Sequence, residues 1–300
     1  MPKSIHVAIG STLSRPGAVE DNLAQIAAHA WRAAADGADL LLTPELSVSG
    51  YGPYPEVLAT AEPAGDGPIH QALARLAADT GVVVAAGLAE RDAGRTFLVH
   101  EVVFPDGSYV VQRKNRVTLH ERPFDTMMQL VPERKDDEIG QPTGAPTFET
   151  FSVRGVRCAV AICADNGVRD LDPILARAGV ELLLGPSGAG GRRQDRIRDD
   201  DLRTEAGRET YAHWLEQTFF PGRDAIRRCL QWGRAQAAVN LCGFDGKEKY
   251  HIGHGTIINP MGEILAVTPG MPNLDRQRPA YAHAVVDVED RLCAPEAALG

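Results

Sequence analysis

The 300-residue sequence lacks the features that would mark a membrane protein, a nucleic-acid-binding protein or a secreted protein. No apolar run approaches the roughly 18–20 residues that cross a bilayer, so no membrane partner is expected. The formal net charge is −9 and no long basic run occurs, which argues against nucleic acid as a partner. Met1-Pro2-Lys3 leads directly into a strand-like segment at 5–9, and we expect no signal peptide.

Cysteine is scarce, and its five positions follow no paired spacing: Cys158, Cys163, Cys229, Cys242 and Cys293. With no signal peptide expected, this pattern predicts free thiols in a reducing cytoplasm. His251 and His254 could suggest a metal site together with Cys242, but their spacing matches no zinc pattern. The sequence therefore gives no reason to expect a metal or a cofactor.

What the sequence does contain is ample apolar material, 44% of residues, arranged with alternating helical and strand periodicity. The spacing predicts helices at 19–35, 69–80, 168–178 and 225–238. It predicts strands at 5–9, 40–43, 82–88, 96–104, 109–113, 148–153, 156–162, 180–184, 239–242, 255–258, 264–267 and 281–286. Tight hairpin turns also occur, so we expect a mixed α/β sheet, or two sheets, covered by helices.

We expect one domain over residues 1–300, because no linker of domain-separating length occurs. Residues 188–222 are charged, glycine-rich at their start and aromatic at their end. They are longer than a connection between core strands requires. This segment is predicted to be an insertion that forms a lid or lobe over a pocket, or an oligomer contact.

Three potentially reactive side chains each follow an apolar strand: Glu45, Lys114 and Cys163. Taken singly, each has an ordinary interpretation, as a loop carboxylate, a surface lysine and a buried small hydrophobe. In α/β sheets, however, binding sites gather beyond the carboxyl ends of strands. A thiol before a turn into a helix also faces free N–H groups that favour a thiolate or an oxyanion.

Three stretches resemble the nitrilase (carbon–nitrogen hydrolase) superfamily, in the order in which that family carries them. They are Leu42-Thr43-Pro44-Glu45-Leu46, the run from Pro105-Asp106-Gly107 to Arg113-Lys114 with Glu121-Arg122 beyond it, and Ile162-Cys163-Ala164-Asp165. Weaker similarity continues through Arg234-Ala235 to Asn259-Pro260-Met261-Gly262. The resemblance implies an αββα sandwich of two mixed sheets, usually paired, and hence a homodimer or higher homo-oligomer.

The resemblance also implies roles for individual residues. Cys163 would be the nucleophile, Glu45 the general base and acid, and Lys114 the oxyanion donor together with the backbone N–H of Ala164. Glu121 falls where the nitrilase branch has a second acid that positions substrate or the lysine. The chemistry is consistent, because a thiol needs activation and the oxyanion needs preorganised donors. No metal or cofactor is implied.

The substrate class is less sharply indicated. At the nucleophile, the nitrilase branch has Cys-Trp-Glu. This chain has Cys163-Ala164-Asp165, which more closely resembles the amidase and carbamoylase branches. We therefore expect a small amide or N-carbamoyl substrate, with a nitrile as the alternative. Acyl transfer to another acceptor and a catalytically idle scaffold homologue also remain open. Tyr51, Ala164, Asp165 and Ser187 are the expected substrate contacts, although Tyr51 could equally pack within its loop.

Overall fold

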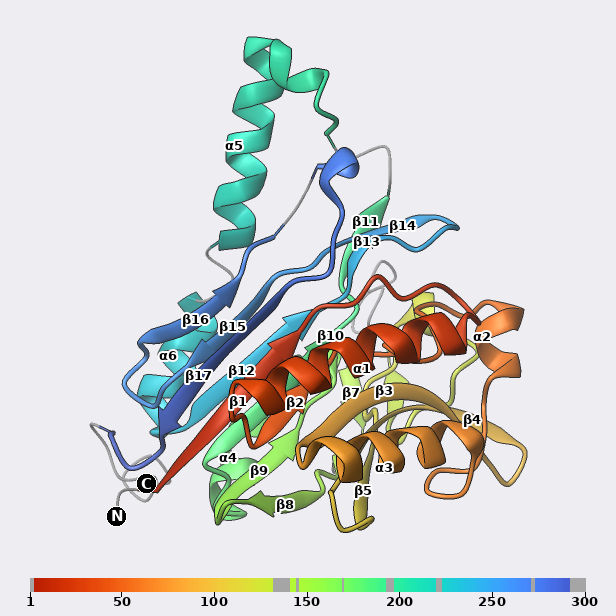
Figure 1. The fold of residues 1–300 in the computed structure, drawn as a ribbon, viewed down its shortest axis with the longest axis vertical. Coiled ribbons are helices and arrows are strands. Elements are labelled where there is room, and N and C mark those ends of the chain that lie inside the picture. Colours follow the sequence, from red (N-terminus) through yellow and green to blue (C-terminus); the bar gives the residue numbers. More distant parts are fainter. Residues whose placement is uncertain are drawn as a thin grey trace.

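Two six-stranded β-sheets form the body of the protein (Figure 1). The computed structural model describes residues 3–131, 141–143, 146–168, 170–192, 197–219, 223–270 and 273–291. The first sheet has the order β17 (Tyr281–Asp287), β1 (Ser4–Gly10), β2 (Leu40–Leu42), β3 (Val83–Asp92), β4 (Arg95–Val103) and β5 (Tyr109–Arg113). The second has the order β16 (Ile264–Thr268), β15 (Gly255–Ile258), β12 (Ala235–Asn240), β10 (Leu182–Ser187), β9 (Val156–Val160) and β8 (Thr150–Val153).

Both sheets are mixed, and helices cover their outer faces. In the first sheet β1, β2 and β3 run parallel, while β17, β4 and β5 pair antiparallel. The helices α1 (Val19–Ala35) and α3 (Pro68–Thr80) pack on it through a cluster that includes Ile26 and Leu73. The helices α4 (Leu171–Arg177) and α6 (Arg223–Trp232) lie against the second sheet. The expected αββα sandwich is thus confirmed.

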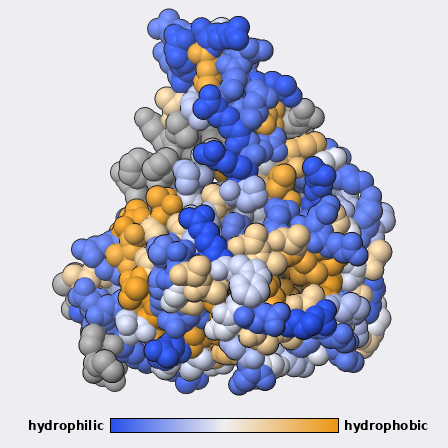
Figure 2. Space-filling model, in the orientation of Figure 1, coloured by the Kyte–Doolittle hydropathy of each residue, from blue (hydrophilic) through white to orange (hydrophobic). Residues whose placement is uncertain are grey.

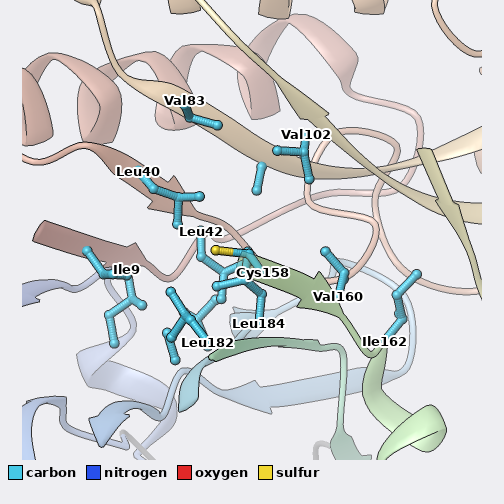
Figure 3. Close-up of a cluster of buried hydrophobic side chains, with 14 of the residues drawn as sticks. Ile9, Leu40, Leu42, Val83, Val102, Cys158, Val160, Ile162, Leu182 and Leu184 are labelled. Atoms are coloured by element: carbon cyan, nitrogen blue, oxygen red, sulfur yellow. The ribbon is translucent and has the colours of Figure 1, made fainter. Parts of the chain in front are cut away.

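The main hydrophobic core lies between the two sheets (Figure 3). Its labelled side chains come from the first sheet (Ile9, Leu40, Leu42, Val83 and Val102) and from the second sheet and its exit (Cys158, Val160, Ile162, Leu182 and Leu184). Successive strand residues point to opposite faces, so Leu182 and Leu184 enter this core while Leu183 packs toward α4. Strands buried on both faces explain the continuous apolar runs in the sequence.

The predicted elements agree closely with the structure in most places. The helix expected at 19–35 is α1 with the same bounds, and both expected hairpins, β4–β5 and β8–β9, form. The helix expected at 225–238 is wrong beyond Trp232, because Gly233 turns the chain with φ of 54°. The alanine-rich stretch that follows is β12, whose alternating burial fits its central place between β10 and β15.

A third, three-stranded sheet was not predicted. It consists of β11 (Gly190–Arg192), β14 (Lys249–Ile252) and β13 (Cys242–Phe244), in that order. Its strands have only three or four residues each, too short to show a clear period in the sequence. The short helix α2 (Pro55–Ala59) and the pair β6 (Gln129–Val131) and β7 (Gln141–Thr143) were also missed.

The excursion at 188–222 has two different parts. Its start supplies β11, which pairs with β14. Its later part contains α5 (Glu205–Phe219), which projects away from the sandwich (Figure 1) and has a largely hydrophilic surface (Figure 2). Apolar surface gathers instead over the neighbouring edge strands of the two sheets, where Ile264, Leu265, Val267 and Val285 are exposed (Figure 2). Among the described residues, no helix is both long and apolar enough to cross a membrane.

Candidate active site

Glu45 is placed by a loop that continues from β2 along the edge of β3. The backbone N–H groups of Thr43 and Val48 donate to the carbonyls of Ala85 and Gly87, each at 2.9 Å. A Cβ on Gly87 would come within 2.2 Å of the Leu46 nitrogen, so only glycine lets the loop approach this closely. The Glu45 carboxylate is thereby fixed in the interior, fully shielded from solvent.

Lys114 joins two carboxylates. It directly follows β5, and its Nζ lies 2.5 Å from Glu45 Oε1 and 2.7 Å from Glu121 Oε1. All three side chains have no solvent exposure. Buried charges need paired partners, and here one ammonium group serves two carboxylates at once. The lysine is therefore held rigidly between them.

Glu121 is itself oriented by its own short 3-10 turn. Thr118 and Glu121 form a reciprocal capping box, in which the Thr118 N–H donates to Glu121 Oε2 at 2.8 Å. The Tyr51 hydroxyl donates to the other oxygen, Oε1, at 2.7 Å. These two hydrogen bonds orient the Glu121 carboxylate toward Lys114. Tyr51 is connected to Lys114 through this carboxylate.

Cys163 follows β9 and starts the 3-10 turn Cys163–Gly167, which leads toward α4. Its φ of 48° lies in the left-handed region, which non-glycine residues seldom occupy. Such strained positions cluster at functional sites. The Ser187 hydroxyl donates to the Cys163 sulfur at 3.4 Å, and the charge of Glu45 acts on the thiol. Cys158, by contrast, points into the hydrophobic core (Figure 3).

The turn that carries Cys163 is tied to the segment that carries Lys114. The Asp165 carboxylate is buried and accepts backbone N–H groups from Arg116 at 2.7 Å, Asn115 at 3.2 Å and Ile162 at 3.3 Å. Arg116 also donates through Nη1 to the Gly167 carbonyl at 3.2 Å. These bonds fix the distance between the nucleophile and the lysine.

The exit of β10 completes the enclosure. The Gly188 N–H donates to Glu45 Oε2 at 2.8 Å. A Cβ at this position would lie 2.3 Å from the Tyr51 ring and 3.0 Å from Glu45 Oε2. Glycine is therefore required for the backbone to reach the carboxylate beneath the tyrosine. Ser187 and Gly188 together place β10 against both Glu45 and Cys163.

Burial and charge set the protonation of this cluster. Burial, with the charge of Glu121, raises the pKa of Glu45 to about 7 against the opposing effect of Lys114. Burial and the Glu45 charge raise the pKa of the Cys163 thiol to about 12. Burial alone would raise the pKa of Glu121, but the Lys114 charge and the hydrogen bonds from Lys114, Thr118 and Tyr51 together hold that pKa below its usual value. The resting thiol is therefore protonated, with a base of near-neutral pKa beside it.

The structure brings together Glu45, Lys114, Glu121, Cys163 and Ser187, all taken from the sequence as site residues. Tyr51 joins them through its hydroxyl, and Ala164 follows the nucleophile in the 3-10 turn. Asp165 lies in the same turn, but its carboxylate contacts backbone N–H groups. Within the described part of the chain, no cluster of three or more His, Cys, Asp or Glu could hold a metal ion.

Three neighbours of the site were missed from the sequence. The Gly188 N–H was hidden in a glycine-rich run that could be recognised only as a strand exit. Lys249 and His251, alternate residues of β14, both approach Tyr51. The Lys249 Nζ lies 4.5 Å from the centroid of the Tyr51 ring, and the His251 ring stands edge-on to it at 5.3 Å. Nothing in the sequence around β14 signals this proximity.

Taken together, the αββα sandwich and the buried Glu–Lys–Cys cluster define a thiol-containing α/β enzyme site. The profile of the carbon–nitrogen hydrolase family matches residues 6–272. The chain therefore belongs to the carbon–nitrogen hydrolase family.

Comparison with individual proteins gives more distant similarities. The omega-amidase NIT2 of Bos taurus is 26% identical over 249 residues, which cover 82% of this chain and 78% of that protein. The glutamine-dependent NAD(+) synthetase of Xanthomonas campestris is 31% identical over 194 residues, but the match spans only 32% of its length. An amidase from Nesterenkonia sp. AN1 superposes with a TM-score of 0.68 at 20% identity, covering 96% of this chain and 94% of that one.

Proposed function

We propose that this protein hydrolyses a C–N bond of a small amide or N-carbamoyl compound through a thioester on Cys163, releasing ammonia or an amine. The observation that carries the proposal is the position of the Glu45 carboxylate. One oxygen binds the Lys114 ammonium at 2.5 Å, the other accepts the Gly188 N–H at 2.8 Å, and the carboxylate lies near enough for its charge to act on the Cys163 thiol. A single base thus faces the nucleophile and the lysine in a site shielded from water.

The first half of the reaction forms the thioester. Glu45 accepts the thiol proton as the Cys163 sulfur attacks the carbonyl carbon. Lys114 and the backbone N–H of Ala164 stabilise the oxyanion, because the first N–H groups of a helical turn have no acceptor within it. The tetrahedral adduct collapses, its C–N bond breaks, and the leaving nitrogen takes the proton from Glu45. Ammonia or an amine departs.

The second half returns the enzyme to its starting state. Water attacks the thioester carbon while Glu45 accepts its proton. The new tetrahedral adduct breaks its C–S bond, and the thiolate recovers the proton from Glu45. A near-neutral pKa suits Glu45 to both directions of transfer. Glu121 and Tyr51 hold Lys114 in place throughout, and Asp165 keeps the turn of Cys163 aligned with it.

An amide is favoured over a nitrile by the sequence Cys163-Ala164-Asp165. The similar Nesterenkonia amidase supports the same choice, since it has been solved in complex with butyramide. A variant of that amidase shows covalent addition of an acetamide moiety at its active-site cysteine. Nitrile hydrolysis is the second candidate, because a similar protein of Trametes versicolor, 22% identical over 284 residues, is an arylacetonitrilase.

We extend the proposal to the surroundings of the site. Tyr51 and Ser187 line the substrate pocket, and β11, at the start of the predicted lid, forms one of its walls. The chain is one catalytic domain that works as a homo-oligomer in a reducing cytoplasm. The four described cysteines are all free, which agrees with that compartment.

The test is a panel of small amides, N-carbamoyl amino acids and nitriles, assayed for release of ammonia. We expect the parent protein to act on amides or carbamoyl compounds, and Cys163→Ala to fold normally and release nothing. Addition of hydroxylamine would divert a thioester to a hydroxamate, which reports acyl transfer. Turnover of nitriles alone would select the second candidate, and full activity of Cys163→Ala would remove Cys163 from the mechanism.

A further inference from the structure

Lys249 is a half-buried cation beside the catalytic cluster that the reaction does not use. It lies on β14 and shares a strand face with His251, since alternate residues of a strand point to the same side. Its Nζ stands over the Tyr51 ring, 4.5 Å from the centroid. The Tyr51 hydroxyl binds Glu121, which in turn binds Lys114. One phenol ring therefore separates the Lys249 ammonium from the catalytic carboxylates.

The backbone around Lys249 is fixed. The N–H groups of Lys247 and Lys249 both donate to Asp245 Oδ1, at 2.7 and 3.1 Å. Pairing of β14 with β11 on one side and β13 on the other holds the strand in register. Lys249 therefore lies on a short strand that is paired on both sides, and its backbone position does not depend on a long loop.

Among the described residues, the Lys249 ammonium has no counter-ion of its own. Lys3, Lys114 and Lys247 each form an ion pair within 4 Å, whereas the Lys249 Nζ forms neither an ion pair nor a hydrogen bond with another described residue. Burial lowers its pKa, while the charges of Glu121 and Glu45 act to raise it. Its charge therefore reaches the catalytic carboxylates without being neutralised by a direct contact.

We propose that Lys249 binds a carboxylate at the far end of the substrate, so that the preferred substrates are short amides or carbamoyl compounds that carry a carboxylate. This inference rests on the proposed function. A substrate anion entering a site with two buried carboxylates would be repelled unless a cation received it. Lys114 is engaged by both carboxylates, and Lys249 is the one lysine in the described part of the chain that forms no ion pair. A single point charge suits a monoanion that reaches it from Cys163 across a few carbon atoms.

Binding to the Cys163→Ala protein tests the subsite without requiring turnover. The probes are succinamate and butyramide, two four-carbon amides that differ in a terminal carboxylate or methyl group. We expect calorimetry to show tighter binding of succinamate. Adding Lys249→Met should weaken it by roughly 10- to 150-fold relative to butyramide, the range for a hydrogen bond to a charged group. Lys249→Arg should restore most of the preference.

Lys247→Met is the matched control, because Lys247 is two residues away and pairs with Glu56 on the surface. It should leave the ratio of the two affinities unchanged. Equal binding of the two probes, or equal weakening of both by Lys249→Met, would overturn the subsite. Succinamate binding that depends on Lys249, in a parent protein that hydrolyses neither probe, would retain the subsite and reject the proposed hydrolysis. Hydrolysis of both probes, with no preference for succinamate, would support the proposed hydrolysis and reject the carboxylate subsite.

Discussion

The buried position of Lys114 makes a strong prediction about stability as well as activity. Lys114→Met removes the ammonium from Glu45 and Glu121 while keeping most of the side-chain volume. Removing one partner of a buried ion pair costs about 3–5 kcal/mol, because the other charge is left uncompensated. Two carboxylates lose their cation here. We therefore expect the free energy of unfolding at pH 8 to fall by at least about 3 kcal/mol.

The loss should depend on pH in a defined direction. In the parent, Lys114 and the hydrogen bonds to Glu121 together keep the pKa of Glu121 low against burial, so this carboxylate contributes stability above its unfolded pKa, and that stability is lost as the pH falls. In the variant, burial alone raises the pKa of both carboxyl groups. A carboxyl group whose pKa is raised in the folded state makes the folded protein less stable as the pH rises. The stability gap between parent and variant must therefore widen from about pH 5 to pH 8.

Urea unfolding at the two pH values measures this gap. Lys247→Met is the control, since its 2.6 Å ion pair with Glu56 is exposed and should cost less than about 1 kcal/mol. Adding Glu121→Gln to Lys114→Met should recover part of the stability by removing one uncompensated carboxylate. Equal losses of unfolding free energy in Lys114→Met and Lys247→Met at pH 8 would refute the claim that Lys114 neutralises two buried carboxylates. A difference between parent and Lys114→Met that narrows with rising pH would refute it as well. Turnover by Lys114→Met should also fall by roughly 10²–10³ fold or more.

Two further predictions concern Glu45 and its surroundings. Burial raises the pKa of Glu45 to about 7. If Glu45 is the base, kcat/KM for an uncharged amide should rise with pH to a plateau above about pH 7. A flat profile from about pH 5.5 to 8.5 would contradict this role. Gly188→Ala should lower kcat/KM at least about tenfold by displacing Tyr51 and Glu45. Gly185→Ala, on the preceding strand β10, meets only ordinary contacts and should change kcat/KM little; equal effects would count against the Gly188 contact.

The reactive residues could be predicted because their positions follow from strand ends. Glu45, Lys114 and Cys163 each come after an apolar run, and the sandwich brings these runs to one place. Glu121 was identified through the family resemblance, because it falls where the nitrilase branch has a second acid; its capping box with Thr118 is a finding of the structure. Local spacing and the order of motifs were enough for these four side chains.

Other features depend on contacts that the local sequence does not encode. The stretch beginning at Ala235 has the composition of a helix, yet it becomes a central strand because its neighbours β10 and β15 pair with it. Lys249 reaches the site only through the pairing of β14 with β11, two strands about 60 residues apart in sequence and too short to be recognised. The three backbone partners of Asp165 likewise belong to turns whose geometry is set by tertiary packing.

The central claim is that Cys163 forms a covalent acyl intermediate with Glu45 as its base. Intact-protein mass spectrometry of the parent protein, quenched with acid during turnover of an amide, tests this most directly. We expect a mass increase equal to the acyl group, which is the amide minus ammonia, located by peptide mapping on Cys163, absent from Cys163→Ala and strongly reduced in Glu45→Gln, which lacks the base for the attack. An adduct at another residue, or one that persists without Cys163, would contradict the mechanism.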